Sequence, residues 1–461
     1  MTRTQPRSPP ASPRTPWTFH GRCALVALAL AAAWAPPALA GREAHGKPKW
    51  AATWAASSNG VYPTGTAVFQ PSLAQAFPSA TTGASDQSFR MIVRPNLWGD
   101  TFRVRFTNAF GTQPVTIDDA YLGLRASSAA VVPGSNRPIT FNGGAGSVTI
   151  APGTYLFSDP VRLDHVSDPD RFFLEGKKLA VSFHVAGQSG PMTWHSKAVQ
   201  TSYVSAPGAG SVGHVEGEAP FKYTTTSWYF IDAIEVVAAA DTAVVVAFGD
   251  SITDGTASTL NGDDRWPDVL ARRLHAAYGN HVSLVNAGIG GNRVTGPTDP
   301  LGSVAGGPGA LVRMERDVFS LSGVSAIVWL EGINDLSALV PPADVIAGYR
   351  EGLRMARERG IKVIQATVTS GLNVASPTPA NQQRDVDRKV LNDFIRSAGI
   401  FDGVADFDAA TLDPATGAIQ AEMLPNSVSQ AIDYLHPNRV GYQAMGSAVN
   451  LSVLAPVGSG R

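Results

Sequence analysis

Cysteine is almost absent from this chain of 461 residues, because Cys23 is its only copy. Cys23 lies in an N-terminal segment that we expect to be removed, so the mature chain would contain none. Disulfides, thiolate catalysis and cysteine-ligated zinc are therefore excluded. The nine histidines form no His-x-His or His-Glu-x-x-His pattern, so a histidine-based metal site has no support either. We expect no metal and no cofactor.

An excess of charge of either sign is also missing, with 36 Lys and Arg against 37 Asp and Glu and a formal charge of −1. Removing a leader that carries four arginines and no acidic residue would leave a formal charge of −5. This balance gives no electrostatic reason to expect nucleic acid or an anionic membrane as a partner.

Residues 1–40 have the pattern of a secretory signal peptide. Four arginines precede an apolar run over residues 23–34, and they are Arg3, Arg7, Arg14 and Arg22. Small residues at 38–40 predict cleavage after Ala40. The apolar run is shorter than the roughly 20 residues of a membrane span, and Arg22 before Cys23 fits poorly with a lipoprotein cleavage site. We expect a secreted or periplasmic protein without stable membrane insertion after cleavage.

The length favours two domains, at roughly 100–200 residues for each. Residues 47–238 consist of short strand-like runs separated by turn residues. Within residues 101–106, apolar and polar residues alternate, which places Phe102, Val104 and Phe106 on one face of a half-buried strand. Because no long helical period appears, this part predicts an all-β domain, either an antiparallel sandwich or a jelly roll.

Residues 241–456 alternate between apolar strands and amphipathic helices. Residues 244–248 form a continuous apolar run, as in a parallel strand that is buried on both faces. Four further strands are expected, at residues 282–285, 326–330, 362–367 and 404–407. This alternation predicts a parallel sheet with crossover helices, in which ligands bind at the carboxyl ends of the strands.

Four short blocks in this second domain carry residues suited to a serine esterase. They are Gly-Asp-Ser-Ile at 249–252, Asn-Ala-Gly-Ile-Gly-Gly-Asn at 286–292, Gly-Ile-Asn-Asp at 332–335 and Asp-Tyr-Leu-His-Pro at 433–437. Three of the blocks directly follow an expected strand, so they should meet at one edge of the sheet. Acyl transfer needs a nucleophile, a base, an orienting acid and hydrogen-bond donors for the oxyanion.

Ser251, His436 and Asp433 are the candidates for nucleophile, base and orienting acid. His436 is the only histidine after position 281, and Asp433 lies three residues before it. Other interpretations stay open, because Ser251 or Asp433 could instead cap a helix. Asp406 and Asp408 are the reserve candidates for the acid.

The oxyanion donors are expected in the second and third blocks. Asn334 offers a side-chain amide, and a glycine of the second block, Gly288, Gly290 or Gly291, offers a backbone N–H that a substrate can approach closely. The glycines could also form only a flexible turn, and residues 334–335 only a turn after a strand.

As a set, the four blocks resemble those of the SGNH, or GDSL-type, hydrolase family. The resemblance implies a flavodoxin-like three-layer α/β/α fold with five parallel strands. It implies Ser251 as the nucleophile, with Asp433 and His436 completing the triad. It further implies three oxyanion donors, which are the Ser251 N–H, Gly291 and Asn334.

The resemblance covers about residues 244–449, and residues 248–255 also resemble a secreted two-domain branch with acetylxylan-esterase-like members. Ile252 replaces the leucine of the motif name, a conservative change. No Gly-x-Ser-x-Gly elbow occurs, which speaks against an α/β-hydrolase fold.

These features predict a secreted serine ester hydrolase that acts through an acyl-enzyme on a small ester or an acetylated polysaccharide. Deacetylation of carbohydrate esters is favoured, with lipase or aryl-esterase activity on short acyl esters as the alternative, and an acyltransferase would use the same triad. In another class, the first domain could make the chain a glycan-binding protein with an ancillary esterase. Its stacking platforms would then be Trp50, Trp54, Trp98, Trp194 and Trp228. The sequence does not predict the oligomeric state.

Overall fold

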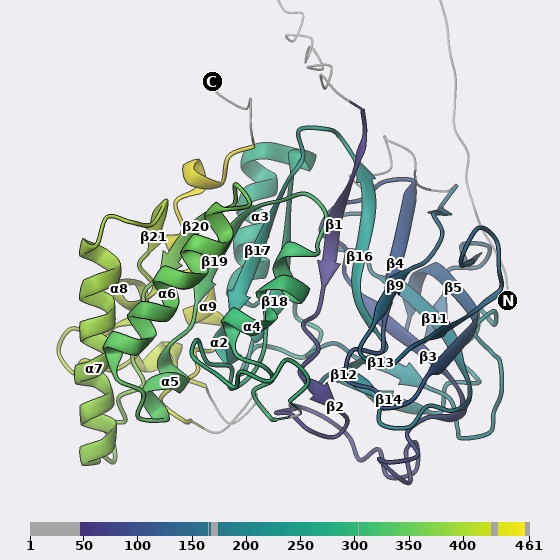
Figure 1. The fold of residues 1–461 in the computed structure, drawn as a ribbon, viewed down its shortest axis with the longest axis horizontal. Helices are drawn as coiled ribbons and strands as arrows, with labels where there is room; N and C mark the ends of the chain where they lie inside the picture. The colour runs from purple at the N-terminus through teal and green to yellow at the C-terminus, as the bar shows by residue number, and fades with distance from the viewer. Residues whose placement is uncertain (1–46, 165, 167–173, 303, 426–431, 457–461) are drawn as a thin grey trace, which may run out of the picture. The chain divides into compact units, whose positions relative to one another are not determined.

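The structure is a computed structural model that describes residues 47–164, 166, 174–302, 304–425 and 432–456. The expected signal peptide, residues 1–40, lies outside the described residues. Figure 1 shows a β-rich region, residues 49–238, followed by an α/β region, residues 243–454, and both belong to one compact unit. The division into two independent domains, residues 47–238 and 241–456, stays a prediction.

Within the described residues, the β-rich region contains three antiparallel sheets. The first has the order β1 (Lys49–Ala55), β16 (Ile231–Ala238), β4 (Thr101–Thr107) and β10 (Val161–Arg162), with β9 (Tyr155–Phe157) also paired to β4. The second has the order β14 (Tyr223–Thr225), β13 (Ser202–Val204), β3 (Ser85–Val93), β11 (Leu179–Gln188), β5 (Val115–Ser127) and β6 (Ala130–Val131), with β7 (Arg137–Pro138) and β8 (Ser147–Ile150) also paired to β5. The third has the order β15 (Trp228–Tyr229), β12 (Thr193–His195) and β2 (Gly60–Val61).

The first two sheets share one apolar core. Phe102, Val104 and Phe106 of β4 are all fully buried, as their spacing predicts. The ring of Phe106 meets that of Phe183 from β11 edge to face, with the centroids 5.5 Å apart. The prediction of an all-β N-terminal part is confirmed, with the inner faces of two sheets packed together.

The other face of β4 differs from the half-buried strand predicted by its alternation. Arg105 is buried there and donates to Asp232 Oδ1 at 2.6 Å and to Ser320 Oγ, in the α/β region, at 2.7 Å. Arg103 likewise pairs with the buried Glu235 at 2.5 Å. Alternation shows which residues are polar but not what covers them. Here partners on β16 and in the α/β region allow a charged face to be buried.

The sheet of the α/β region is parallel. Its order is β18 (Val282–Gly288), β17 (Ala243–Gly249), β19 (Val324–Leu330), β20 (Lys362–Ala366) and β21 (Gly403–Ala405). This order is that of flavodoxin-like folds, so the predicted fold class is confirmed. One predicted strand end is wrong, because Phe407 begins a helix. Asp406 caps that helix by accepting from the Ala409 N–H at 3.1 Å.

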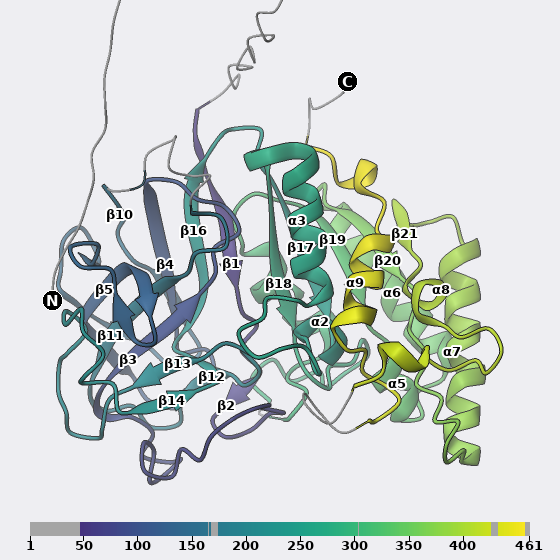
Figure 2. The same cartoon turned by 180° about the vertical axis from the view of Figure 1, so that it is seen from behind.

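Helices cover both faces of this sheet (Figures 1 and 2). On one face, α3 (Trp266–Tyr278) and α9 (Arg439–Ala448) pack with Val245 and Ala247 of β17. On the other, α4 (Ala310–Met314), α6 (Pro342–Arg357) and α7 (Pro379–Ser397) pack with Val244, Val246 and Phe248. The shorter helices are α2 (Ser251–Asp254), α5 (Ile333–Ser337), α8 (Phe407–Thr411), η2 (Gly279–His281), η3 (Glu315–Phe319), η4 (Ala421–Met423) and η5 (Leu451–Leu454). Successive residues of β17 enter opposite cores, which is why this strand is apolar without alternation.

Alanines join the β-rich region to the core of the α/β region. Ala51, Ala52 and Ala55 of β1 and Ala233 of β16 lie in the same buried cluster as residues of β17. The backbones approach so closely that Ser283 Oγ of β18 donates to Ala52 O at 2.7 Å. Side chains of both regions therefore build this core.

Across the ranges that the structure describes, no helix combines the length and apolarity needed to cross a membrane. Nor, in the same ranges, do three or more His, Cys, Asp or Glu side chains gather in a way that could hold a metal ion.

We predict that Gly352→Ala destabilises the fold, although the helix propensity of alanine is more favourable than that of glycine by about 1 kcal/mol. A Cβ at position 352 in α6 would lie 2.5 Å from Cζ3 of the buried Trp329, and overpacking of a core costs about 1–3 kcal/mol. Urea unfolding should show a net loss of stability. The exposed Ser447→Ala in α9 is the control and should change stability by no more than about 0.5 kcal/mol. A Gly352→Ala variant more stable than the parent would contradict this packing.

Candidate active site

The four sequence blocks meet at the carboxyl edge of the parallel sheet. Ser251 follows β17, Gly291 follows β18 and Asn334 follows β19. Asp433 and His436 lie in the segment before α9, and hydrogen bonds connect them to Ser251. Side chains far apart in the sequence are thus brought together by the topology of the sheet.

Ser251 is the first residue of α2. Asp250 caps this helix, because its Oδ1 accepts from the Ile252 N–H at 3.0 Å, so the serine hydroxyl is not needed as a cap. Among the described residues, the Ser251 N–H has no acceptor, as expected in the first turn of a helix. The preceding turn is tight, since a Cβ on Gly249 would lie 2.1 Å from Leu330 O.

Ser251, His436 and Asp433 form a continuous hydrogen-bonded chain. Ser251 Oγ lies 2.8 Å from His436 Nε2, and His436 Nδ1 lies 2.5 Å from Asp433 Oδ2. A carboxylate only accepts, so Nδ1 carries the proton and Nε2 accepts from the serine hydroxyl. Asp433 Oδ1 accepts from the N–H groups of Leu435 and His436 at 3.0 Å each, which fixes the turn between acid and base.

The Asp433 carboxyl is held in its ionised form. Burial alone raises the pKa of Asp433, but the hydrogen bond and charge of His436, with the two backbone N–H groups, lower it to about 2. An ionised carboxylate stabilises the imidazolium that forms when His436 takes up a proton. The reserve candidates lie elsewhere, because Asp406 and Asp408 both pair with Arg396.

The three glycines of the second block differ in their hydrogen bonds. The N–H of Gly288 donates to Asn286 Oδ1 at 2.8 Å, and that of Gly290 donates to Asp254 Oδ2 at 2.9 Å. The N–H of Gly291 has no acceptor within the described part of the chain. Its φ of +83° is a left-handed conformation that glycine adopts without strain. Of the three, Gly291 is the one whose N–H is available to a ligand.

The side chain of Asn334 reaches from α5 to the second block. Its Nδ2 donates to Asn292 O at 3.0 Å, and since an amide nitrogen carries two hydrogens, one remains for a ligand. The neighbouring Asp335 is buried and accepts from the N–H groups of Val294 and Thr295 at 2.8 and 3.0 Å. These bonds fix the loop after β18 against α5.

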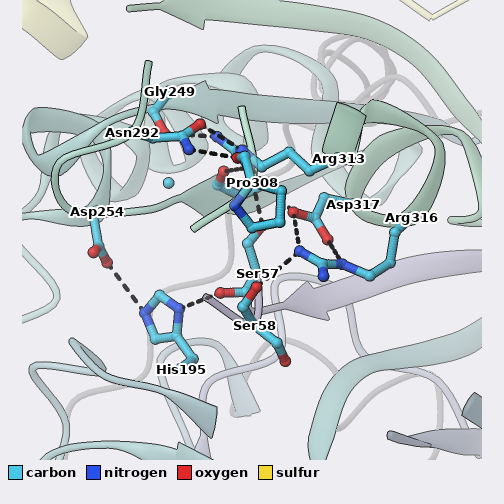
Figure 3. A network of polar contacts seen from close by, with 12 residues as sticks. Ser57, Ser58, His195, Gly249, Asp254, Asn292, Pro308, Arg313, Arg316 and Asp317 are labelled. Atoms are coloured by element: carbon cyan, nitrogen blue, oxygen red, sulfur yellow. Dashed lines mark hydrogen bonds and ion pairs between the residues drawn. The ribbon is translucent and has the colours of Figure 1, made fainter. Parts of the chain in front are cut away.

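A buried arginine of α4 connects the ends of the first two strands (Figure 3). Arg313 donates to Gly249 O of β17 at 2.8 Å and to Ala287 O of β18 at 2.7 Å. Its Nε donates to Asn292 Oδ1 at 2.6 Å, while Asn292 Nδ2 donates to Pro308 O at 2.7 Å. One side chain thereby fixes the backbone on both sides of the site.

Two further buried acids lie near this arginine. Burial raises the pKa of Asp250 to about 7 against the hydrogen bond from the Ile252 N–H, and it raises the pKa of Glu331 to about 8 against the charge of Arg313. Burial thus favours the protonated form of both carboxyl groups over the ionised form.

Three side chains that shape the site were not predicted from the sequence: Asn292, Arg313 and Asp254. Asn292 ends the second block and Asp254 lies three residues after Ser251, so their positions next to the motifs were a usable signal. Arg313 offers a weaker one, a lone charge within the apolar segment Ala310–Met314.

Residues 247–444 match the model of a family described as GDSL-like Lipase/Acylhydrolase. A search of curated proteins found no match. Among solved structures, the chain is similar to a carbohydrate acetylesterase family member from Sinorhizobium meliloti, with 16% identity over 46% of this chain and 97% of that one and a TM-score of 0.35. It is also similar to the native aryl esterase of M. smegmatis, with 16% identity over 45% and 95% of the two chains and a TM-score of 0.34. A GDSL-like lipase from Bacteroides thetaiotaomicron gives 17% identity over 46% and 88% and a TM-score of 0.33.

We predict that Asp433 makes stability depend on pH in the acid range. Its folded pKa of about 2 lies below the ordinary value of 3.8, so its ionised form stabilises the fold above pH 3.8, and this contribution is lost as pH falls towards 2. Urea unfolding of the parent and of Asp433→Asn should show a stability difference that shrinks between about pH 5 and pH 3. A difference that stays constant over this interval would rule out a depressed pKa.

Proposed function

We propose that Ser251, His436 and Asp433 are the catalytic triad of this carboxylic ester hydrolase, whose residues 247–444 match the GDSL-like lipase/acylhydrolase family. The observation that carries the proposal is the pair of hydrogen bonds, 2.8 Å between Ser251 Oγ and His436 Nε2 and 2.5 Å between His436 Nδ1 and Asp433 Oδ2. A hydroxyl beside an oriented imidazole is what nucleophilic catalysis needs.

The proposed reaction proceeds through an acyl-enzyme. Ser251 Oγ attacks the ester carbonyl while its proton passes to His436 Nε2, which gives a tetrahedral intermediate. The imidazolium, oriented by Asp433, donates this proton to the alcohol oxygen as the carbon–oxygen bond to the alcohol breaks. Water then loses a proton to His436 and attacks the acyl carbon, which releases the carboxylic acid and restores the serine hydroxyl.

We assign three donors to the oxyanion: the N–H groups of Ser251 and Gly291 and the second hydrogen of the Asn334 amide. Neither backbone N–H has an acceptor among the described residues, and Asn334 Nδ2 uses one hydrogen on Asn292. Donors that are fixed before the reaction need no reorganisation when the charge develops, which is the main source of their effect.

We further propose that the protein is secreted or periplasmic and that it removes acetyl groups from carbohydrate esters. Ser251 is buried, with 6% of its surface exposed, and the His436 side chain is 14% exposed, so solvent reaches the pair mainly at the imidazole. The described α/β region contains no long apolar segment that could form a lid, which favours short acyl groups. Short-chain lipase or aryl-esterase activity is the alternative, and added alcohol acceptors would reveal an acyltransferase.

The burial of the tryptophans weighs against a glycan-binding role for the β-rich region. Trp54, Trp98, Trp194 and Trp228 are 7%, 6%, 2% and 5% exposed. Trp54 packs edge-on against Trp228 with centroids 4.9 Å apart, so both belong to the core. Only Trp50 is partly exposed. Because four of these five rings cannot stack on a sugar from solvent, we do not extend the proposal to glycan binding.

We predict that Ser251→Ala abolishes ester hydrolysis, because the nucleophile is lost. The measurement is a panel of acetylated xylan and of short-chain and long-chain aryl esters, run on the parent and on Ser251→Ala. Ser447→Ala, on the exposed face of α9, is the control. Retained activity in Ser251→Ala would contradict the triad, and a preference for long chains would contradict the acetyl-carbohydrate proposal.

We predict that Asn334→Ala lowers kcat by about 10²–10³ with little change in KM, because one oxyanion donor is removed. The control is Asn450→Ala, which removes only the cap of η5. A KM effect without loss of kcat would mean that Asn334 binds the ground state instead.

A further inference from the structure

His195 connects the β-rich region to the first catalytic block (Figure 3). This buried side chain of β12 places Nδ1 2.7 Å from Ser57 O and Nε2 3.1 Å from Asp254 Oδ1. A carbonyl and a carboxylate are both acceptors only, so both contacts are hydrogen bonds at once only when the ring carries two protons. The His195 ring is thus held between Ser57 O of the β-rich region and Asp254 of the α/β region.

Asp254 in turn binds the loop that carries Gly290 and Gly291. Its second oxygen, Oδ2, accepts from the Gly290 N–H at 2.9 Å. Burial raises the pKa of Asp254, but the charges of His195, Lys197 and Arg265 outweigh it, and the pKa lies below the ordinary value. The carboxylate is thus a charged acceptor, and a charged acceptor makes a stronger hydrogen bond to a backbone N–H than a neutral acceptor does.

The β-rich region also contacts Gly290 directly. A Cβ at this position would lie 2.3 Å from Thr66 Oγ1 and 2.7 Å from Lys197 Nζ. Two side chains of the β-rich region therefore fill the space beside this glycine. Lys197 is itself buried and donates to Thr256 Oγ1 in the α/β region. The loop that carries Gly291 is therefore held from outside the α/β region as well as from within it.

We propose that His195 is a positioning residue for the oxyanion donor Gly291, acting through Asp254 and Gly290. With its N–H fixed on Asp254, Gly290 sets the direction from which the chain enters the left-handed turn at Gly291, whose N–H is left free for the substrate. The inference rests on the proposed function, since it assigns a second region of the chain to the same site.

The test compares two variants of nearly equal size. His195→Asn places its amide where Nδ1 stood, within reach of Ser57 O but not of Asp254, whereas the longer His195→Gln reaches Asp254. The control is His184→Ala, because His184 is also a buried histidine of the β-rich region, with Nδ1 2.6 Å from Asp118 and Nε2 2.9 Å from Asp86.

The measurements are kcat, KM and the affinity for a short-chain alkylboronic acid, which forms a tetrahedral adduct with the serine and places an oxygen in the oxyanion site. We expect His195→Asn to lose about tenfold to hundredfold in kcat and a similar factor in boronate affinity, with KM within about twofold. His195→Gln should recover a large part of both losses, and His184→Ala should keep parental kcat and affinity even if its Tm falls.

The inference is overturned if His195→Asn keeps parental kcat and boronate affinity, if His195→Gln is as impaired as His195→Asn, or if His184→Ala loses as much as His195→Asn. Ester hydrolysis by the parent and its loss in Ser251→Ala are measured in the same series. An inactive parent would therefore contradict the proposed function, whereas an active parent with an unaffected His195→Asn would contradict only the role of His195.

Discussion

The buried guanidinium of Arg313 is the interaction on which the site depends. It binds the carbonyls of Gly249 and Ala287 at the ends of β17 and β18, and the side chain of Asn292 in the loop beyond. Parallel strands bring their ends to one edge, where Gly249 O also accepts from the Ile289 N–H at 3.0 Å. A buried cation bound to both strand-end carbonyls adds to this pairing, so the segments that carry Ser251 and Gly291 keep one relative position before any substrate binds.

Much of the fold could be predicted from the sequence because the signals are local. The unbroken apolar run before Ser251 and the helical spacing after it predict a parallel strand and a crossover helix, whereas the flavodoxin-like topology came from the family resemblance. The needs of acyl transfer and the family resemblance, rather than strand position, led to the expectation that Ser251, His436 and Asp433 meet. The structure brings them together within hydrogen-bonding distance. Their catalytic roles and those of Gly291 and Asn334 stay predictions.

The remainder depends on packing between distant segments, which a single sequence does not show. Nothing near Arg105 in the sequence shows that the α/β region covers this face of its strand, where Arg105 donates to Ser320 Oγ. Nothing near Gly290 reveals the contact with Thr66. Alanines such as Ala52 appear in the sequence as weak strand formers, yet their small side chains let two sheets approach and share one core. The positions of the strands could be predicted, but the partners of their side chains and the segments that cover each face could not.

The proposed acid and base belong to one short turn, because Asp433 accepts from the backbone N–H of His436 and also binds its ring. In a triad built from three separate segments, the acid and the base must each be placed independently before the imidazole can take the serine proton. Here the turn already holds Asp433 and His436 together, so only its position against Ser251 has to be fixed. If this turn moved away from Ser251, the hydrogen bond between His436 and the serine hydroxyl would break. The bond between Asp433 and His436 would remain, and so would the tautomer of the imidazole. The site could then become reactive again when the turn returns, with no other change.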